Sequence, residues 1–299
     1  MMFLSVTVIS SCRKKETVST FTFSGMGTVL NVIYTGHKNT PLEKSLKADV
    51  EKIERYFSYF DPESYISAIN KKGYAEDISV PSEVCDLIEL SMRLNKDTEG
   101  FFDITYKSER KHSQHRKENI LTDCVNNKVK LLKKDTLLDL GGIAKGYAID
   151  RAGLILKNHG VKNFIVNYGG DMLVCGKKGR EPWKIGIRDP DNKDRILKTM
   201  VLDDECTGLA TSGNYERFIE KDGSVHSHII DPLSGTPANN SRSVTVVGRD
   251  ATTVDALATA ISASNLDEVF IKKIVDKFSV KIYTLSDRES VWKKYGTEN

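Results

Sequence analysis

Hydrophobic residues follow two different spacings along the first third of the chain. Apolar and polar positions alternate through 21–34, on both sides of Gly25-Met26-Gly27, which predicts two strands joined by a tight turn. Apolar residues three and four positions apart predict amphipathic helices at 41–60 and 81–95. The chain therefore begins with strands and continues with helices.

The centre and the end of the chain repeat this change of spacing. The pattern predicts a short strand at 135–140, a turn at Gly141-Gly142 and a helix at 143–158. It then predicts helices at 253–264 and 266–277 and a last strand at 280–284. Between these, alternation and turn residues predict a block of strands, at 163–170, 171–176, 183–190, 198–202, 208–213 and 241–248.

Helices that cluster between blocks of strands indicate an α+β fold with mostly antiparallel sheets and flanking helices. We find no short internal repeat, and a distant duplication into two similar halves stays open. With 299 residues, of which 39% are apolar and 28% charged, the chain is long enough to bury a real core, which excludes general disorder.

Charge and hydropathy exclude two further classes. Lys and Arg number 44 and Asp and Glu 41, and a net charge of +3 over the whole length is too small to indicate a nucleic-acid binder. No apolar run approaches the ~20 residues that a membrane-spanning helix needs. We therefore expect no nucleic-acid partner and a body that does not cross a membrane.

The cysteines are widely spaced and form no C-x-x-C pair, so we expect neither a disulfide scaffold nor a structural zinc site. Their number is odd, which leaves one thiol for a separate use, and Cys12 is the candidate. The five are Cys12, Cys85, Cys124, Cys175 and Cys206.

The first twenty residues resemble a processing segment. An apolar stretch at 1–11, too short to span a membrane, is followed by Cys12 and the basic run 13–15. Ile9-Ser10-Ser11-Cys12 resembles a bacterial lipobox, in which the cysteine is acylated; the alternative is a buried N-terminal strand. We expect a signal segment and tether at 1–20 and one domain at 21–299, held at a membrane outside the cytoplasm by acylated Cys12.

Asp255 and Thr259 are the first candidates for chemistry. Their spacing of four places carboxylate and hydroxyl on one face of the predicted helix, among small alanines that allow a ligand to come close. Two oxygen donors suit a hard ion such as Mg²⁺, which keeps waters and phosphate ligands besides. By spacing alone, an ordinary solvent-facing helix is the better explanation.

The segment 138–147 combines a strand, a glycine turn and a helix start, which together present free backbone N–H groups to an anion. Lys145 lies in the first turn of that helix. The segment matches neither the Walker loop nor G-x-G-x-x-G, and a glycine turn that only reverses the chain is the alternative.

Histidines form two further candidates. His228 borders a turn, where an imidazole serves either as a general base near neutral pH or as a hydrogen-bonded structural residue. His112 and His115 have H-x-x-H metal spacing, but the almost wholly polar stretch 107–118 around them favours a solvated loop.

Taken together, eight ordered segments within residues 22–285 resemble one family, the ApbE family of FAD:protein FMN transferases. Any one segment is weak evidence, whereas the ordered set is specific. The segments are GMGT (25–28), FDPES (60–64), GFFDIT (100–105), LDLGGIAKGYAID (138–150), NYGGD (167–171), ATSGNYER (210–217), HIIDPLSG (228–235) and VDALATA (254–260).

This resemblance implies the fold and the roles of individual residues. It implies an ApbE-like (T-fold-like) α+β architecture, with Mg²⁺ held by Asp255, Thr259 and the backbone carbonyl of Gly142. It places Lys145 at the diphosphate of FAD and His228 as the base. The positions that it matches to the lining of the FAD site are Met26, Phe60, Phe101, Phe102, Asp103 and Ile230.

The implied reaction transfers the FMN half of FAD to a threonine or serine hydroxyl of an acceptor protein, such as a subunit of a membrane redox complex, and releases AMP. Two alternatives stay open: a Mg²⁺-dependent FAD pyrophosphatase, in which water replaces the acceptor, and a surface lipoprotein that only binds flavin. With the lipobox, the resemblance implies a place in the cell envelope, on the periplasmic face in a Gram-negative organism.

Overall fold

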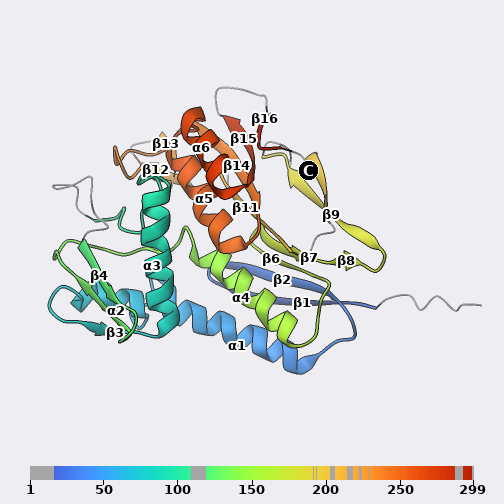
Figure 1. Ribbon diagram of the computed structural model, residues 1–299, viewed down its shortest axis with the longest axis horizontal. Coiled ribbons are helices and arrows are strands. Elements are labelled where there is room, and N and C mark those ends of the chain that lie inside the picture. Colours follow the sequence, from blue (N-terminus) through green and yellow to red (C-terminus); the bar gives the residue numbers. More distant parts are fainter. Residues whose placement is uncertain are drawn as a thin grey trace, which may run out of the picture.

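One large sheet with helices on one face and a small hairpin sheet on the other makes up most of the fold (Figure 1). In no part of the chain that the structure describes is a helix long and apolar enough to cross a membrane. The computed structural model describes residues 17–108, 119–190, 192, 194–202, 206–213, 218–221, 224–227, 229–286 and 292–297.

The large sheet has eight strands, and every neighbouring pair is antiparallel. Buried residues alternate along its strands; in β2, for example, Leu30, Val32 and Tyr34 are buried. In spatial order the strands are β1 (Val18–Gly25), β2 (Thr28–Thr35), β6 (Phe164–Tyr168), β7 (Asp171–Cys175), β11 (Thr207–Ser212), β14 (Ser241–Gly248), β15 (Lys281–Ser286) and β16 (Trp292–Tyr295).

Two helices, α4 (Ala144–Asn158) and α5 (Ala251–Ala263), pack directly against one face of this sheet. The side chain of Asp150 in α4 accepts hydrogen bonds from the first two backbone N–H groups of α5, at 2.9 and 2.8 Å. Because those N–H groups have no partner within their own helix, Asp150 fixes where α5 begins relative to α4. The first turn of α5 therefore lies against the first half of α4.

The remaining helices extend the same core. Figure 1 shows α1 running beside α4, and an ion pair of 2.9 Å between Asp49 and Arg151 joins them. A small antiparallel sheet packs with α2 and α3 at the far end. The elements are α1 (Thr40–Phe57), α2 (Tyr65–Lys72), α3 (Ser82–Asp97), α6 (Glu268–Phe278), and the strands β3 (Ile78–Ser79), β4 (Ile120–Asp123) and β5 (Lys128–Leu131).

A second, smaller core covers the opposite face of the large sheet. Along β6, Phe164 and Val166 belong to the main core whereas Ile165 belongs to the second, as expected because successive side chains of a strand point to opposite faces. Trp183 and Met200 form the side of the second core opposite the large sheet. They come from the sheet of β8 (Lys177–Lys178), β9 (Glu181–Arg188) and β10 (Ile196–Leu202); a separate hairpin pairs β12 (Phe218–Lys221) with β13 (Ser224–Ser227).

The cysteine prediction is wrong, because the structure contains two disulfides. Cys85 on the buried face of α3 pairs with Cys124 in the turn after β4, with their Cα atoms 5.5 Å apart. Cys175 at the end of β7 pairs with Cys206 beside the start of β11. The partners are 39 and 31 residues apart in sequence and are brought together only by packing and strand pairing. Cys12 lies outside the described residues.

Most predicted elements are confirmed, and the segment 135–140 is the main exception. It forms no strand, because the side-chain amide of Asn70 replaces a neighbouring strand as its partner. Asn70 Oδ1 accepts from the N–H of Leu138 at 2.7 Å, and Asn70 Nδ2 donates to the Leu138 carbonyl at 2.9 Å. The first predicted helix also ends earlier than expected, at Phe57, and α2 was not predicted.

The contact between α4 and α5 depends on Gly146. A Cβ at this position would lie 2.3 Å from the carbonyl oxygen of Ala251 and 2.8 Å from the Cα of Thr252. We expect Gly146→Ala to destabilise the fold by about 3 kcal/mol, because both obstacles are backbone atoms that cannot rotate away. Urea unfolding measures the change in the free energy of unfolding.

A matched control lies in the same helix. A Cβ at Gly153 would meet the Cδ2 atom of Leu173 at 2.5 Å, which is the flexible end of a side chain, so we expect Gly153→Ala to be much less destabilising. Equal urea midpoints for the two variants would show that the close approach of the helices does not limit stability.

Candidate active site

Lys145 lies at the centre of a buried charge cluster built from three elements. It occupies the first turn of α4, and its Nζ donates to Asp171 Oδ2 and to Asp255 Oδ1, the latter at 3.2 Å. Asp171 begins β7 and also accepts from the backbone N–H of Thr211 at 2.8 Å. Asp255 in α5 also accepts from the N–H of Gly146 at 2.9 Å. The cluster therefore ties both helices to the sheet.

Burial sets the charge state of the cluster. Burial raises the pKa of Asp255 to about 6, with Lys145 opposing this shift and Asp171 adding to it. Burial alone would lower the pKa of Lys145, but Asp171 and Asp255 outweigh it and raise that pKa above its ordinary value. The ammonium group thus stays charged between two carboxylates. With both carboxylates ionised, the cluster has one negative charge in excess, which favours a nearby cation.

Two of the three oxygen donors that the resemblance assigns to Mg²⁺, Asp255 and Thr259, lie on α5, and the glycine turn that carries the third lies against that helix. A Cβ at Gly142 would lie 3.2 Å from Thr259 Oγ1, so the glycine turn before α4 touches the helix that carries Asp255. Asp255 precedes Thr259 by one helical turn of α5. One carboxylate, one hydroxyl and one backbone carbonyl fit a hard cation that keeps waters and phosphate oxygens as further ligands.

A site of this kind has few protein carboxylates. Accordingly, no group of three or more His, Cys, Asp or Glu side chains able to hold a metal occurs among the described residues. A structural zinc site, which needs four protein ligands, does not fit the residues around Gly142 and Thr259. These donors would fit a hard cation such as Mg²⁺ only together with waters or phosphate oxygens, because they include a single carboxylate.

Residues predicted to line the FAD site follow α3. Phe102 is buried, and its ring lies 3.4 Å from the position that a Cβ of Gly142 would occupy. Phe101 packs against Phe270 with ring centroids 4.8 Å apart. Asp103 Oδ1 accepts from both the N–H and the hydroxyl of Thr105, which closes the turn. This turn thus lies beside Gly142.

The other predicted lining residues lie on three separate segments. Met26 is in the β1–β2 turn with a φ of 48°, and its N–H donates to Glu54 Oε1 at 2.6 Å. Phe60 follows α1 and is 85% exposed, with its ring edge-on to Tyr59. Ile230 forms an isolated bridge with Pro237. No hydrogen bond recorded for the described residues joins these three to Lys145.

The histidine candidates cannot be placed. His228, His112 and His115 all lie outside the described residues, so their roles stay predictions. The strand β13 ends at Ser227, immediately before His228, and Ile229 immediately after it is buried.

Sequence reasoning missed two aspartates at this site. Asp171 bonds Lys145, and Asp139 forms an ion pair of 2.7 Å with Lys107 and accepts from the hydroxyl of Tyr106 at 3.0 Å. Burial and then the charge of Asp139 raise the pKa of Tyr106. The signal was present, since both aspartates lie in the segments NYGGD and LDLGG that carried the resemblance.

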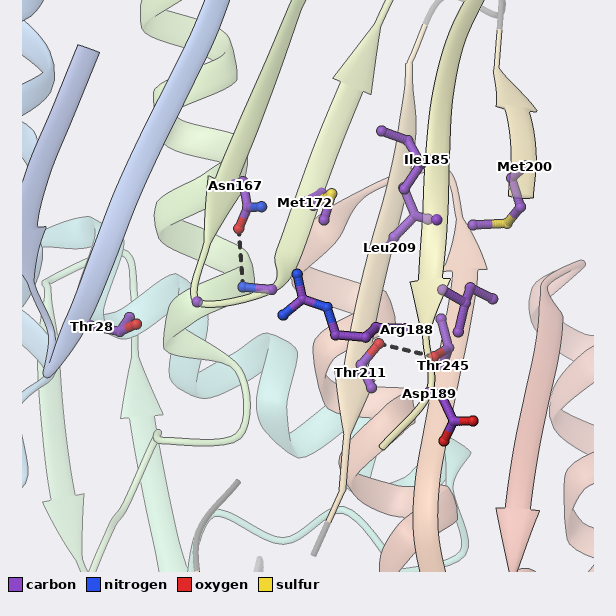
Figure 2. A pocket seen from close by; sticks show the side chains of 14 residues that line it. Thr28, Asn167, Met172, Ile185, Arg188, Asp189, Met200, Leu209, Thr211 and Thr245 are labelled. Atoms are coloured by element: carbon purple, nitrogen blue, oxygen red, sulfur yellow. Dashed lines mark hydrogen bonds between the residues drawn. The ribbon is translucent and has the colours of Figure 1, made fainter. Parts of the chain in front are cut away.

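A cavity of about 620 Å³ lies on the other face of the sheet, between its strands and β9 (Figure 2). Thr211 lines it with its side chain, whose hydroxyl lies 2.9 Å from that of Thr245, while the backbone N–H of Thr211 bonds Asp171. The cavity and the charge cluster are therefore separated by the sheet and share one residue.

Comparison with known proteins identifies the family. The family model described as "ApbE family" matches residues 26–280. Among curated proteins, FAD:protein FMN transferase from Vibrio cholerae serotype O1 is 28% identical over 283 residues, covering 86% of this chain and 84% of the relative. FAD:protein FMN transferase from Escherichia coli K12 is 24% identical over 284 residues, covering 86% of this chain and 80% of the relative.

Solved structures agree in fold. The ApbE protein from Thermotoga maritima has a TM-score of 0.80 and 29% identity, covering 93% of this chain and 97% of its own. The flavin transferase ApbE from Vibrio cholerae has a TM-score of 0.79 at 24% identity, covering 94% and 97%. These neighbours confirm the predicted fold class. Because the family model matches most of the length of this chain, the chain belongs to the ApbE family.

Proposed function

We propose that this protein transfers the FMN half of FAD to a threonine or serine hydroxyl of an acceptor protein. The acceptor oxygen forms a bond to the FMN phosphorus, the diphosphate bond breaks, and AMP leaves. The relatives named above are FAD:protein FMN transferases, and their names imply FAD and a protein as substrates. The observation that carries the proposal is Lys145 held between the buried carboxylates of Asp171 and Asp255, on the helix that begins just after the Gly142–Thr259 contact.

The proposed reaction has to overcome the negative charge of the FAD diphosphate. A diphosphate repels an incoming oxygen nucleophile, so positive charge must be held beside it. The resemblance places Lys145 at the diphosphate, but Asp171 and Asp255 already balance its charge, so a cation bound beside them would have to supply the net positive charge. Asp255, Thr259 and the Gly142 carbonyl would hold Mg²⁺, which supplies that charge at the phosphate oxygens when bound.

The remaining residues would bind the two ends of FAD and move one proton. Met26, Phe60 and Ile230 offer apolar surface from separate segments, and the turn with Phe101, Phe102 and Asp103 borders Gly142. His228 would accept the proton of the acceptor hydroxyl as the new bond forms.

Incubation with FAD, Mg²⁺ and a purified flavin-acceptor domain tests this function. We expect the acceptor to gain a covalent FMN, seen by mass spectrometry, together with one AMP per flavin attached. Free FMN with AMP and an unlabelled acceptor would instead identify a hydrolase. FAD binding that is insensitive to chelators, without AMP, would identify a flavin-binding protein.

We also propose that the domain acts in the cell envelope, tethered through residues 1–20 and an acyl group on Cys12. The disulfides Cys85–Cys124 and Cys175–Cys206 support a location outside the cytoplasm, because disulfides persist in oxidising compartments. Mass spectrometry of the N-terminal peptide of the membrane fraction measures the acylation directly.

A further inference from the structure

The cavity beside β9 has two chemically different ends. Met172, Leu209 and Ile185 are apolar, and they line it from β7, β11 and β9. Thr28 and Arg188 line it as well, and these are polar. Its volume of about 620 Å³ is within the range of ligand-binding sites. An occupant therefore needs both apolar and polar groups.

The strand β9 offers an open edge to this cavity. Five consecutive residues, 185–189, line it, and because successive side chains of a strand point to opposite faces, the cavity must border the strand's backbone. On one side β9 pairs with β10 from Trp183 to Arg188. On the other side, among the described strands, β8 pairs with it only at Pro182 and Glu181. The free edge is suited to an added strand of peptide.

Arg188 gives the cavity its charge preference. Figure 2 shows its side chain extending across the cavity toward Asn167. Asp189 also lines the cavity, but its carboxylate is paired with Arg195 at 3.2 Å, whereas none of the described carboxylates forms an ion pair with Arg188. An unpaired guanidinium group, with its fixed fork of donors, matches a carboxylate.

The cavity also lies close to the proposed reaction. Thr211 lines it and bonds Asp171 through its backbone, and Asp171 bonds Lys145. Thr28, the first residue of β2, and Gly170 in the β6–β7 turn also line the cavity. Met26, which the ApbE resemblance assigns to FAD, lies in the turn just before Thr28. A chain seated in the cavity would pass the turn at Gly170, next to Asp171, to reach the charge cluster on the other face of the sheet.

We infer that this cavity receives the segment of the acceptor protein next to its reactive hydroxyl. The segment is extended and acidic: it adds to the free edge of β9, its carboxylate pairs with Arg188, and its apolar side chains contact Met172 and Leu209. This inference rests on the proposed function and adds how the protein acceptor is selected.

Charge reversal at Arg188 tests the inference. We expect Arg188→Glu to raise the acceptor concentration for half-maximal flavin transfer at least about tenfold, with the Kd for FAD unchanged. Isothermal titration of the same acceptor domain in the absence of FAD should show a matching loss of affinity. Arg188 is exposed, so the variant should fold normally.

Lys184→Glu is the matched control. Lys184 is exposed on the same strand but does not line the cavity, and its replacement by Glu changes the net charge by the same amount as Arg188→Glu. Equal effects of the two variants, or wild-type acceptor binding by Arg188→Glu, would overturn the inference while leaving flavin transfer intact. If the wild-type protein releases AMP and never labels or binds the acceptor, the proposed function fails, and the inference fails with it.

Discussion

An Asp255→Ala variant is expected to lose Mg²⁺-dependent flavin transfer by at least about 10³-fold. Asp255 is the one carboxylate in the proposed set of magnesium ligands, and it also bonds Lys145 and the first turn of α4. Its loss removes the negative charge that holds a cation beside Thr259. Transfer to an acceptor domain, measured across a Mg²⁺ titration, should not recover at high metal concentration.

Asp250→Ala controls for damage to the helix. Asp250 caps the same helix by accepting from the N–H of Thr253 at 2.7 Å, so its loss costs about 1 kcal/mol of stability without touching the metal donors. We expect this variant to retain transfer. Unchanged transfer by Asp255→Ala in the presence of Mg²⁺ would refute the metal assignment.

A His228→Ala variant is expected to bind FAD normally and to transfer FMN about 10² to 10⁴ times more slowly. The reason is that a base contributes to the movement of the proton from the acceptor hydroxyl, and not to the binding of the dinucleotide. Quenching of flavin fluorescence measures the Kd for FAD, and single-turnover labelling of the acceptor measures the rate of the chemical step.

His226→Ala is the corresponding control. His226 lies two residues before His228 in the sequence, and it pairs in register with Ile219 of β12. It should transfer at the wild-type rate. Full activity of His228→Ala would remove His228 as the base, and a large loss of FAD affinity would assign it to binding.

Local patterns in the sequence were sufficient for most of the elements. The apolar run in 241–248 matches β14, and the predicted helix 253–264 matches α5 to within two residues. Both elements are buried on nearly all sides, so their apolar composition and flanking turn residues identified them, and these require no knowledge of distant residues. The segment 135–140 was misassigned because its partner is the side chain of Asn70, which no periodicity reveals.

The sequence by itself therefore indicated most of the helices and strands and the ApbE family, and it supplied the candidate residues, whose roles stay predictions. Only the tertiary structure decided the disulfide pairs, the place of Asp171 beside Lys145 and the contact of Gly142 with Thr259. Cys85–Cys124 depends on α3 packing beside β4, and Cys175–Cys206 depends on β7 lying next to β11. The other contacts depend on α4 meeting α5 at Gly146, which brings together residues as far apart as Lys145 and Asp255. Such contacts are set by packing between distant segments, and local sequence carries no record of them.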